Sequence, residues 1–217
     1  MKSFHKILIA NRGEIAVRII RAAKENGIKS VAVYAADDVD SLHVLLADEA
    51  ILITGKTLVE TYLNQEKIIQ IALGSGAGAI HPGYGFLSEN ADFAQKVSDS
   101  GLVFIGPTPE NIRLMGEKNR ALTYVESLGI PVLKSFRGTI AEILKYTSEM
   151  EFPVVVKASG GGGGKGMVIC QSVEELHPGL QKAERQALDY FGNGDLFVEK
   201  YLPCVRHIEV QLLADHH

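Results

Sequence analysis

The chain has 217 residues, of which 46% are hydrophobic and 22% are charged, and its formal net charge is −4. This length and composition indicate an ordinary globular protein of one or two domains, with a core large enough to need no cross-links. The mild charge, with no block of lysine and arginine, argues against a nucleic-acid-binding surface, and no basic amphipathic helix suggests a membrane surface.

The two cysteines, Cys170 and Cys204, are too few for a disulfide framework, so we expect both thiols to be reduced and unreactive. The N-terminal stretch has only four consecutive apolar residues, too few for the core of a signal peptide. No apolar run approaches the roughly 20 residues of a membrane-spanning helix. Together these features predict a cytoplasmic protein.

Strand and helix patterns alternate in the first part of the chain. The continuous apolar run 6–10 is typical of a buried parallel strand, and a helical stripe follows it up to Gly27, which suits a helix C-terminus. Asn64 is placed to cap a later helix. Further strands are expected at 29–35, 50–54, 79–81 and 102–106, and further helices at 41–47, 65–73 and 91–101. This alternation predicts an open, mostly parallel α/β sheet over about the first 105 residues.

A second pattern begins at Thr108-Pro109-Glu110, a strong helix start, and the helical pattern runs to Gly129 with Gly116 as a candidate break. Beyond it we expect strands at 131–138, 152–158 and 167–171, helices at 139–150 and 172–190, and two adjacent strands at 196–202 and 206–214. Pro178 is expected to disturb its helix. This region is predicted to be a small α+β unit. Because the last strand would leave an apolar sheet edge exposed, we expect a fragment or a chain that continues.

Five consecutive glycines, 160–164, separate two apolar, β-prone runs. A P-loop would need a glycine where Ser159 stands and a hydroxyl side chain where Gly166 stands. A dinucleotide-binding glycine pattern is present, but the helix that should open directly after it is missing, because 167–171 is typical of a strand. Neither of the two familiar phosphate-binding motifs therefore explains the loop.

Strand, glycine loop and strand instead predict a hairpin whose backbone N–H groups form a nest for phosphates. The glycines cost about 0.5–1 kcal/mol each relative to alanine, which a bound polyanion would offset. We therefore expect the loop to be disordered without nucleotide; a plain flexible hairpin is the alternative. Lys157 ends the apolar strand before the loop, where an ammonium needs a charged partner such as a phosphate.

Five segments in this order together resemble biotin carboxylase, the ATP-grasp component of acetyl-CoA, propionyl-CoA, methylcrotonyl-CoA and pyruvate carboxylases. The segments are IANRGEIAVRIIRAA (9–23), HPGYGFLSEN (81–90), IGPTPENIRLMGEK (105–118), VVKASGGGGGKGM (155–167) and RHIEVQLLAD (206–215). The resemblance covers essentially the whole chain. It implies a Rossmann-like parallel α/β domain over 1–113, followed over 114–217 by the first part of an ATP-grasp domain with its α+β lid at about 133–203.

The resemblance implies an ATP-dependent ligase that uses MgATP and bicarbonate to make carboxyphosphate and then carboxylates biotin. The implied cofactors are ATP and Mg²⁺, with biotin as a carrier-bound substrate. The implied partners are a biotin carboxyl carrier protein or domain, a carboxyltransferase, and a second copy in a homodimer. Acetyl-CoA carboxylase and fatty acid biosynthesis are the implied setting.

Residues at the phosphate end follow from the same resemblance. It implies that Lys118 and Lys157 hold the ATP phosphates, that the loop containing Gly163 and Gly164 closes over them, and that His207 binds on the ribose and phosphate side. Without the resemblance, the spacing favours an exposed helix lysine at Lys118, and His207 could lie on any half-polar strand.

Residues at the adenine and biotin ends are implied in the same way. The backbone of Lys200 and Leu202 would read the edge of the base, and Glu199 would accept the exocyclic amine. Tyr84 would lie near biotin and bicarbonate. The alternatives are a charge pair at a sheet edge for Glu199 and Lys200, and a turn aromatic for Tyr84. Arg21 and Glu25 have the spacing of a surface pair, although the family uses these positions at its dimer interface.

The family's metal-binding glutamates, bicarbonate-handling cations and base lie in a later segment, so we expect no catalytic or metal-binding residue up to His217. Phosphoryl transfer depends on those charges, and we expect no bicarbonate-dependent ATPase activity from this chain alone. The rival hypotheses are another ATP-grasp ligase, such as a carbamoyl-phosphate synthase half or a purine-pathway ligase, and a non-catalytic nucleotide-binding or dimerising module. The segment 81–90 favours biotin carboxylase over the other ligases.

Overall fold

The computed structural model describes residues 4–116, 118–158, 167–191, 194–206, 208–210 and 212. The chain divides into two compact units, residues 1–121 and 122–217. Among the described residues, no helix combines the length and the apolar character that crossing a bilayer requires.

The first unit and the helix that leads out of it contain these elements: β1 (Lys6–Ile9), α1 (Gly13–Glu25), β2 (Lys29–Tyr34), the 3₁₀ helix η1 (Ala36–Asp38), α2 (Leu42–Leu46), β3 (Glu49–Leu52), α3 (Gln65–Gly74), β4 (Ala79–His81), α4 (Ala91–Asp99), β5 (Val103–Phe104), α5 (Pro109–Gly116) and α6 (Lys118–Ser127). The second unit contains β6 (Ser135–Gly138), α7 (Ile140–Leu144), η2 (Thr147–Glu149), β7 (Val154–Ala158), β8 (Val168–Cys170), α8 (Val173–Phe191) and β9 (Leu196–Lys200).

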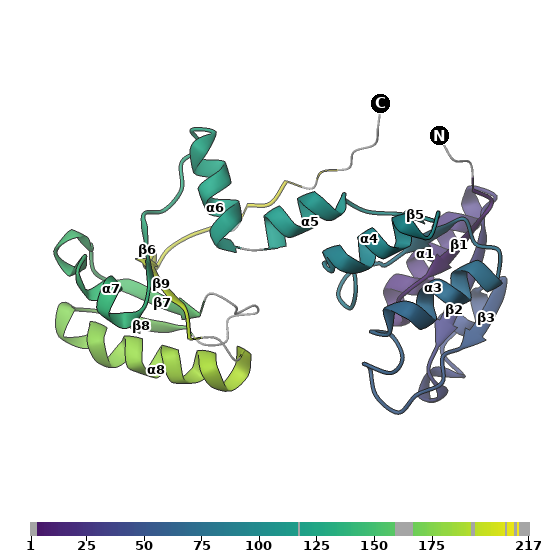
Figure 1. Ribbon diagram of the computed structural model, residues 1–217, viewed down its shortest axis with the longest axis horizontal. Helices are drawn as coiled ribbons and strands as arrows, with labels where there is room; N and C mark the ends of the chain where they lie inside the picture. The colour runs from purple at the N-terminus through teal and green to yellow at the C-terminus, as the bar shows by residue number, and fades with distance from the viewer. Residues whose placement is uncertain are drawn as a thin grey trace. The chain divides into compact units, whose positions relative to one another are not determined.

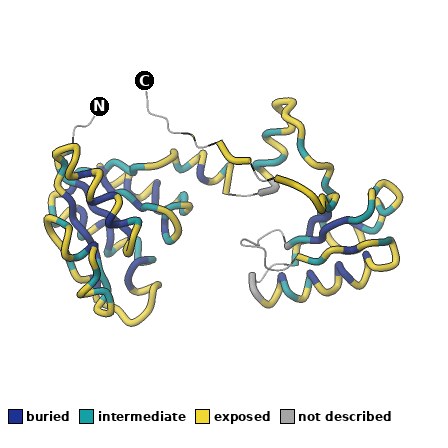
Figure 2. Tube along the Cα trace, turned by 180° about the vertical axis from the view of Figure 1, so that it is seen from behind, coloured by how far each residue is buried: buried dark blue, intermediate teal, exposed yellow. Residues whose placement is uncertain are grey.

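The first unit is a parallel sheet with the strand order β3-β2-β1-β4-β5 and helices on both faces (Figure 1). Side chains alternate along β1: Ile7 and Ile9 belong to the cluster that packs on α1, whereas Leu8 packs with α3 and α4. The central strands β1, β2 and β4 are largely buried, whereas the edge strands β3 and β5 are exposed or half-buried (Figure 2). The predicted parallel α/β sheet is confirmed.

Several predicted helix ends are also confirmed. The Asn64 side chain accepts a hydrogen bond from the Lys67 N–H at 3.0 Å, so it caps α3. Thr108 Oγ1 accepts from the Asn111 N–H at 3.2 Å at the start of α5. Gly27 follows α1 with φ at 69°, a left-handed conformation that favours glycine. Short-range capping rules therefore located these ends correctly.

Sequence reasoning missed a polar cluster at the carboxyl edge of this sheet. The Asp38 carboxylate accepts hydrogen bonds from Tyr62 Oη at 2.7 Å and from Arg12 at 3.1 Å. Tyr62 is fully buried, and its Oη also accepts from the Ala35 N–H at 3.0 Å. Burial acts to raise the pKa of Asp38, but the hydrogen bonds from Tyr62 and Arg12 outweigh it and hold the pKa below its ordinary value. The cluster fixes the loops that follow β1 and β2.

The second unit is an antiparallel sheet with the order β6-β9-β7-β8, and α7 and α8 pack on one face of it. The buried side chains of α8 follow one stripe along the helix, at Leu176, Leu180, Ala183 and Ala187. The helix runs through Pro178, so the expected interruption there is not observed. The predicted α+β unit is confirmed.

The prediction of a strand at 206–214 beside the strand at 196–202 was wrong for the described residues. β9 already has a partner on each side, because β6 pairs with residues 196–199 and β7 pairs with residues 196–200. Of the described residues beyond 205, none belongs to a strand, and Ile208, Val210 and Leu212 are exposed. Alternating apolar residues therefore did not produce pairing where the neighbouring strand positions were already occupied.

We predict that Asp38→Asn destabilises the protein by about 1–2 kcal/mol at pH 7, because the charge that accepts both hydrogen bonds is lost. The pKa of Asp38 is lower in the folded than in the unfolded chain, so the carboxylate stabilises the fold above the unfolded value of about 3.9. That contribution is lost as the pH falls through the folded pKa.

Urea unfolding at a series of pH values should therefore show the wild-type and Asp38→Asn curves converging below about pH 4. Asp40→Asn, at an exposed position two residues away, is the matched control and should change stability little at any pH. A gap between wild type and Asp38→Asn that stays constant down to pH 2–3 would contradict the role of Asp38.

Candidate functional site

Tyr84 lies at the topological switch point of the first unit. The chain leaves β1 toward β2 on one side and returns to add β4 on the other side of β1. In open α/β sheets, ligands bind outside the carboxyl ends of the strands at such a point. Tyr84 follows β4, its side chain is 60% exposed, and its Oη donates to Glu14 in the first turn of α1. The fold thus places Tyr84 where this class of sheet binds ligands.

Lys157 and Glu199 lie on one face of the second sheet. In the register of β7 and β9, Lys157 is opposite Phe197, and Val155 is opposite Glu199. Residues two apart on a strand share a face, so these four side chains all lie on one side, while α7 and α8 cover the other. The structure therefore brings two of the predicted nucleotide ligands together.

The partner of Lys157 in the structure is Glu199. Their ammonium and carboxylate groups form an ion pair, and Lys157 Nζ also lies 5.6 Å from the centre of the Phe197 ring. Both side chains are mostly buried, with exposed fractions of 22% and 12%. The prediction that Lys157 needs a charged partner holds, but a carboxylate fills that role here. A phosphate at Lys157 would have to share the ammonium with Glu199.

The backbone just after β9 has one side without strand pairing. Tyr201 N–H donates to the Pro153 carbonyl at 2.8 Å, so Tyr201 faces the β7 side. Hydrogen bonding alternates along an antiparallel strand, so the backbone groups of Lys200 and Leu202 face the β6 side. The pairing of β6 with β9 stops at Ser135 and Glu199. The polar groups of Lys200 and Leu202 are thus placed where a flat ligand edge could meet them.

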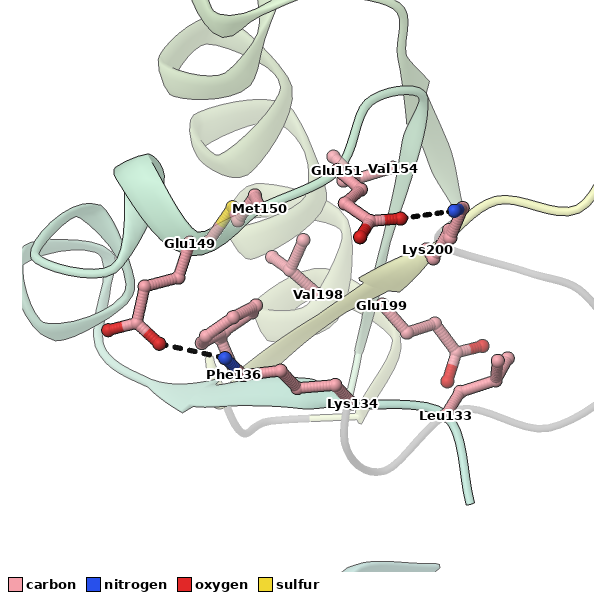
Figure 3. A pocket seen from close by; sticks show the side chains of 10 residues that line it. All are labelled: Leu133, Lys134, Phe136, Glu149, Met150, Glu151, Val154, Val198, Glu199 and Lys200. Atoms are coloured by element: carbon pink, nitrogen blue, oxygen red, sulfur yellow. Dashed lines mark hydrogen bonds and ion pairs between the residues drawn. The ribbon is translucent and has the colours of Figure 1, made fainter. Parts of the chain in front are cut away.

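A pocket of about 140 Å³ lies beside this segment, on the face of the sheet that packs on the helices (Figure 3). Its lining residues are Leu133, Lys134, Phe136, Glu149, Met150, Glu151, Val154, Val198, Glu199 and Lys200. Ion pairs between Lys134 and Glu149, at 2.8 Å, and between Lys200 and Glu151 stand at its rim. Ligand pockets usually measure about 300–1,000 Å³, so we interpret this one as the loosely packed end of the second core.

The other predicted site residues lie wholly or partly outside the described part of the chain. Gly163, Gly164 and His207 are not among the described residues, and neither is the glycine loop that was expected to be disordered without nucleotide. Lys118 begins α6, but only its backbone is described. Among the described residues, no group of three or more histidine, cysteine, aspartate or glutamate side chains could hold a metal ion.

The remaining sequence observations are also located. Arg21 and Glu25 are both exposed on α1, as either a surface pair or an interface would require. Cys170 is buried, and burial raises the pKa of its thiol, whereas Cys204 is exposed; both are free cysteines. A raised pKa favours the protonated form of the Cys170 thiol, which is the less nucleophilic form.

Two family models match the chain. The family described as "Biotin carboxylase, N-terminal domain" matches residues 3–112, and the family described as "Carbamoyl-phosphate synthase L chain, ATP binding domain" matches residues 117–217. A parallel α/β unit followed by an antiparallel sheet with helices on one face fits these two matches in their chain order. The chain belongs to the biotin carboxylase family.

Individual relatives agree with this membership. The chain is 48% identical over 216 residues to a biotin carboxylase of Haemophilus influenzae, covering 98% of this chain and 48% of that protein. It is 47% identical over 215 residues to a biotin-dependent acyl-coenzyme A carboxylase alpha3 subunit of Mycobacterium leprae, covering 98% of this chain and 36% of that protein. The chain thus spans less than half of the length of either relative and matches their N-terminal portion.

A solved structure resembles the chain closely. The biotin carboxylase domain of the 2-oxoglutarate carboxylase of Hydrogenobacter thermophilus is 45% identical, with a TM-score of 0.86. The match covers 94% of this chain and 45% of that one. That domain was crystallised as a dimer in complex with MgADP, ADP and bicarbonate.

We predict that Lys157 and Glu199 stabilise the second unit as a pair. Lys157→Met leaves a mostly buried carboxylate unpaired, Glu199→Gln leaves a mostly buried ammonium unpaired, and the double variant removes both charges. The double variant should therefore lose less stability than the sum of the losses in the two single variants, with a coupling energy of about 1–3 kcal/mol. Urea unfolding of the four proteins measures this coupling. Additive losses, within about 0.3 kcal/mol, would show that the pair contributes nothing.

Proposed function

We propose that the chain forms the nucleotide-binding N-terminal part of a biotin carboxylase, which carboxylates carrier-bound biotin with MgATP and bicarbonate through carboxyphosphate. The observation that carries the proposal is the grouping of Lys157 and Glu199 on one sheet face, beside the unpaired backbone side of Lys200 and Leu202. An adenine nucleotide needs a cation for its phosphates and polar backbone groups for the edge of its base, and this part of the sheet supplies both.

In this proposal each group has its own task. Lys157 binds the α- and β-phosphates, and Glu199 accepts a hydrogen bond from the exocyclic amine of adenine. The backbone of Lys200 and Leu202 reads the Watson–Crick edge of the base, and Tyr84 faces the biotin and bicarbonate end. Lys118, Gly163, Gly164 and His207 remain predictions for the phosphate and ribose end.

ATP fits the described residues, because they supply a cation and a hydrogen-bonding backbone edge. Magnesium does not: these residues provide no carboxylate cluster for it. We propose that the ion and the bicarbonate are held by groups contributed by the remainder of the complete protein. Magnesium would supply charge neutralisation on the transferred phosphoryl group.

The partners, the domain division and the location are also proposals. We propose a homodimer that works with a biotin carboxyl carrier protein or domain and a carboxyltransferase. We propose a Rossmann-like domain over 1–113 and the start of the ATP-grasp domain over 114–217, with its lid at about 133–203; the family matches end at 112 and begin at 117. The cytoplasmic location stays a prediction.

The rival ligases are less well supported. The second family model names carbamoyl-phosphate synthase in its description, but it covers only the nucleotide-binding part. The first model names biotin carboxylase and covers residues 3–112, which include Tyr84. The substrate-side part of the chain therefore favours biotin carboxylase.

We predict that Lys157→Ala weakens MgATP binding by about 10- to 100-fold, because a hydrogen bond to a charged group contributes about 1.5–3 kcal/mol. Isothermal titration of the 217-residue chain with MgATP measures the effect, and circular dichroism confirms that the variant is folded. Lys182→Ala, on the exposed surface of α8, changes the charge equally and should leave binding unaltered. Equal affinities for Lys157→Ala and the wild type would refute the proposed nucleotide site.

A further inference from the structure

The turn that carries Tyr84 is held by one buried side chain from a distant part of the sequence. Asn11 follows β1 and is only 4% exposed. Its Nδ2 donates both hydrogens across the sheet, to the Pro82 carbonyl and to the Tyr84 carbonyl, each at 2.7 Å. Its Oδ1 accepts from the Arg12 N–H at 2.9 Å. Every hydrogen-bonding group of this amide is therefore used, and the partners fix its orientation.

The two carbonyls that Asn11 binds lie on either side of Gly83. This residue has φ at 67°, in the left-handed region, so the chain reverses sharply there. A Cβ at this position would lie 2.8 Å from Asn11 Nδ2 and 3.1 Å from Ile15 Cγ1. The glycine and the asparagine thus fit each other, and neither can be enlarged or displaced without moving the turn.

Further contacts on both sides leave the turn little freedom. The Gly83 N–H donates to His81 Nδ1 at 3.1 Å, and the Ser88 N–H donates to the Gly85 carbonyl at 2.9 Å. Phe86, whose φ is 44°, stacks on the Tyr62 ring with 5.3 Å between centroids, and the Arg12 guanidinium lies 5.9 Å from the Phe86 centroid. Between Pro82 and Phe86, Tyr84 carries the exposed side chain of this fixed backbone.

We infer that Asn11 is a positioning residue for Tyr84: by binding the carbonyls before and after Gly83, it sets where the Tyr84 phenol stands at the switch point. This inference rests on the proposed role of Tyr84 at the biotin end of the site. A group that positions a substrate must itself be held by its neighbours. An exposed aromatic side chain on a loose turn would lose conformational entropy on binding a substrate, and this loss would weaken binding.

The first test measures whether Asn11 holds the turn. Asn11→Asp is nearly isosteric but replaces the two donated hydrogens with an oxygen that faces two carbonyl oxygens. Amide hydrogen exchange on the 217-residue chain should become at least tenfold faster at Gly83 and Ser88, the hydrogen-bonded amides of the turn. Asn26→Asp, the matched control at the other end of α1, should leave these rates unchanged. Unchanged exchange at both amides in Asn11→Asp would overturn the inference.

Gly83→Ala provides a second, independent variant if Asn11→Asp does not fold. It disturbs the same contact from the opposite side, through the short approach to Asn11 Nδ2. It should accelerate exchange at Ser88 while leaving the Asn64-capped helix α3 protected. Protection at Ser88 equal to that of the wild type would count against the inference.

The second test measures whether Asn11 acts through Tyr84, in the complete carboxylase polypeptide with free biotin as substrate. Asn11→Asp should raise the KM for biotin about tenfold and leave the KM for ATP within about twofold, whereas general destabilisation would affect both. Adding Asn11→Asp to Tyr84→Ala should cause little further loss, because residues that act as a unit are non-additive.

The outcomes separate the two hypotheses. Suppose that Tyr84→Ala impairs biotin turnover, but that adding Asn11→Asp to Tyr84→Ala causes the same further loss as Asn11→Asp causes in the wild type. Asn11 then does not act through Tyr84, and the inference is wrong while the proposed function stands. If Tyr84→Ala changes neither constant, the proposed role of Tyr84 is wrong, and the inference falls with it. Equal increases in the KM for biotin and for ATP in Asn11→Asp would also overturn the inference.

Discussion

In the antiparallel pair formed by β7 and β9, Lys157 lies opposite Phe197 and Val155 lies opposite Glu199. The register keeps the lysine and the glutamate off the face that packs on α7 and α8, and a shift by one residue would direct both charges into that core. The same strand then delivers Lys200 and Leu202 to the position where pairing with β6 has stopped. The proposed nucleotide site therefore depends on strand register more than on any single side chain.

In the first unit, strand order places the candidate site residues. Its parallel order creates a switch point between β1 and β4, and the residues that follow these two strands hold each other there. Asn11 and Arg12 reach the turn after β4 from the end of β1, and Asp38 and Tyr62 hold Arg12 in place. One unit thus offers a fixed backbone with an exposed phenol, and the other offers a paired cation and a backbone edge.

Sequence reasoning located what depends on neighbouring residues. The parallel sheet, the cap at Asn64 and the helix start at Thr108 follow from local periodicity and capping. The ion pair of Lys157 with Glu199 and the bonds from Asn11 to the turn after β4 join residues 42, 71 and 73 positions apart, which no local pattern reveals. The error at 206–214 has the same origin, because an alternating apolar run does not show which strand edges are free.

Among the residues that the structure describes, three core clusters each lie within one unit: two are built from residues that precede Pro107, and the third begins at Ile140. During synthesis, all the side chains of the first two clusters have been made before the ribosome reaches the lysine and glycine segment of the second unit. Domains generally fold as units from the N-terminus while the chain grows. The parallel sheet can therefore begin to fold while the later antiparallel strands are still being translated.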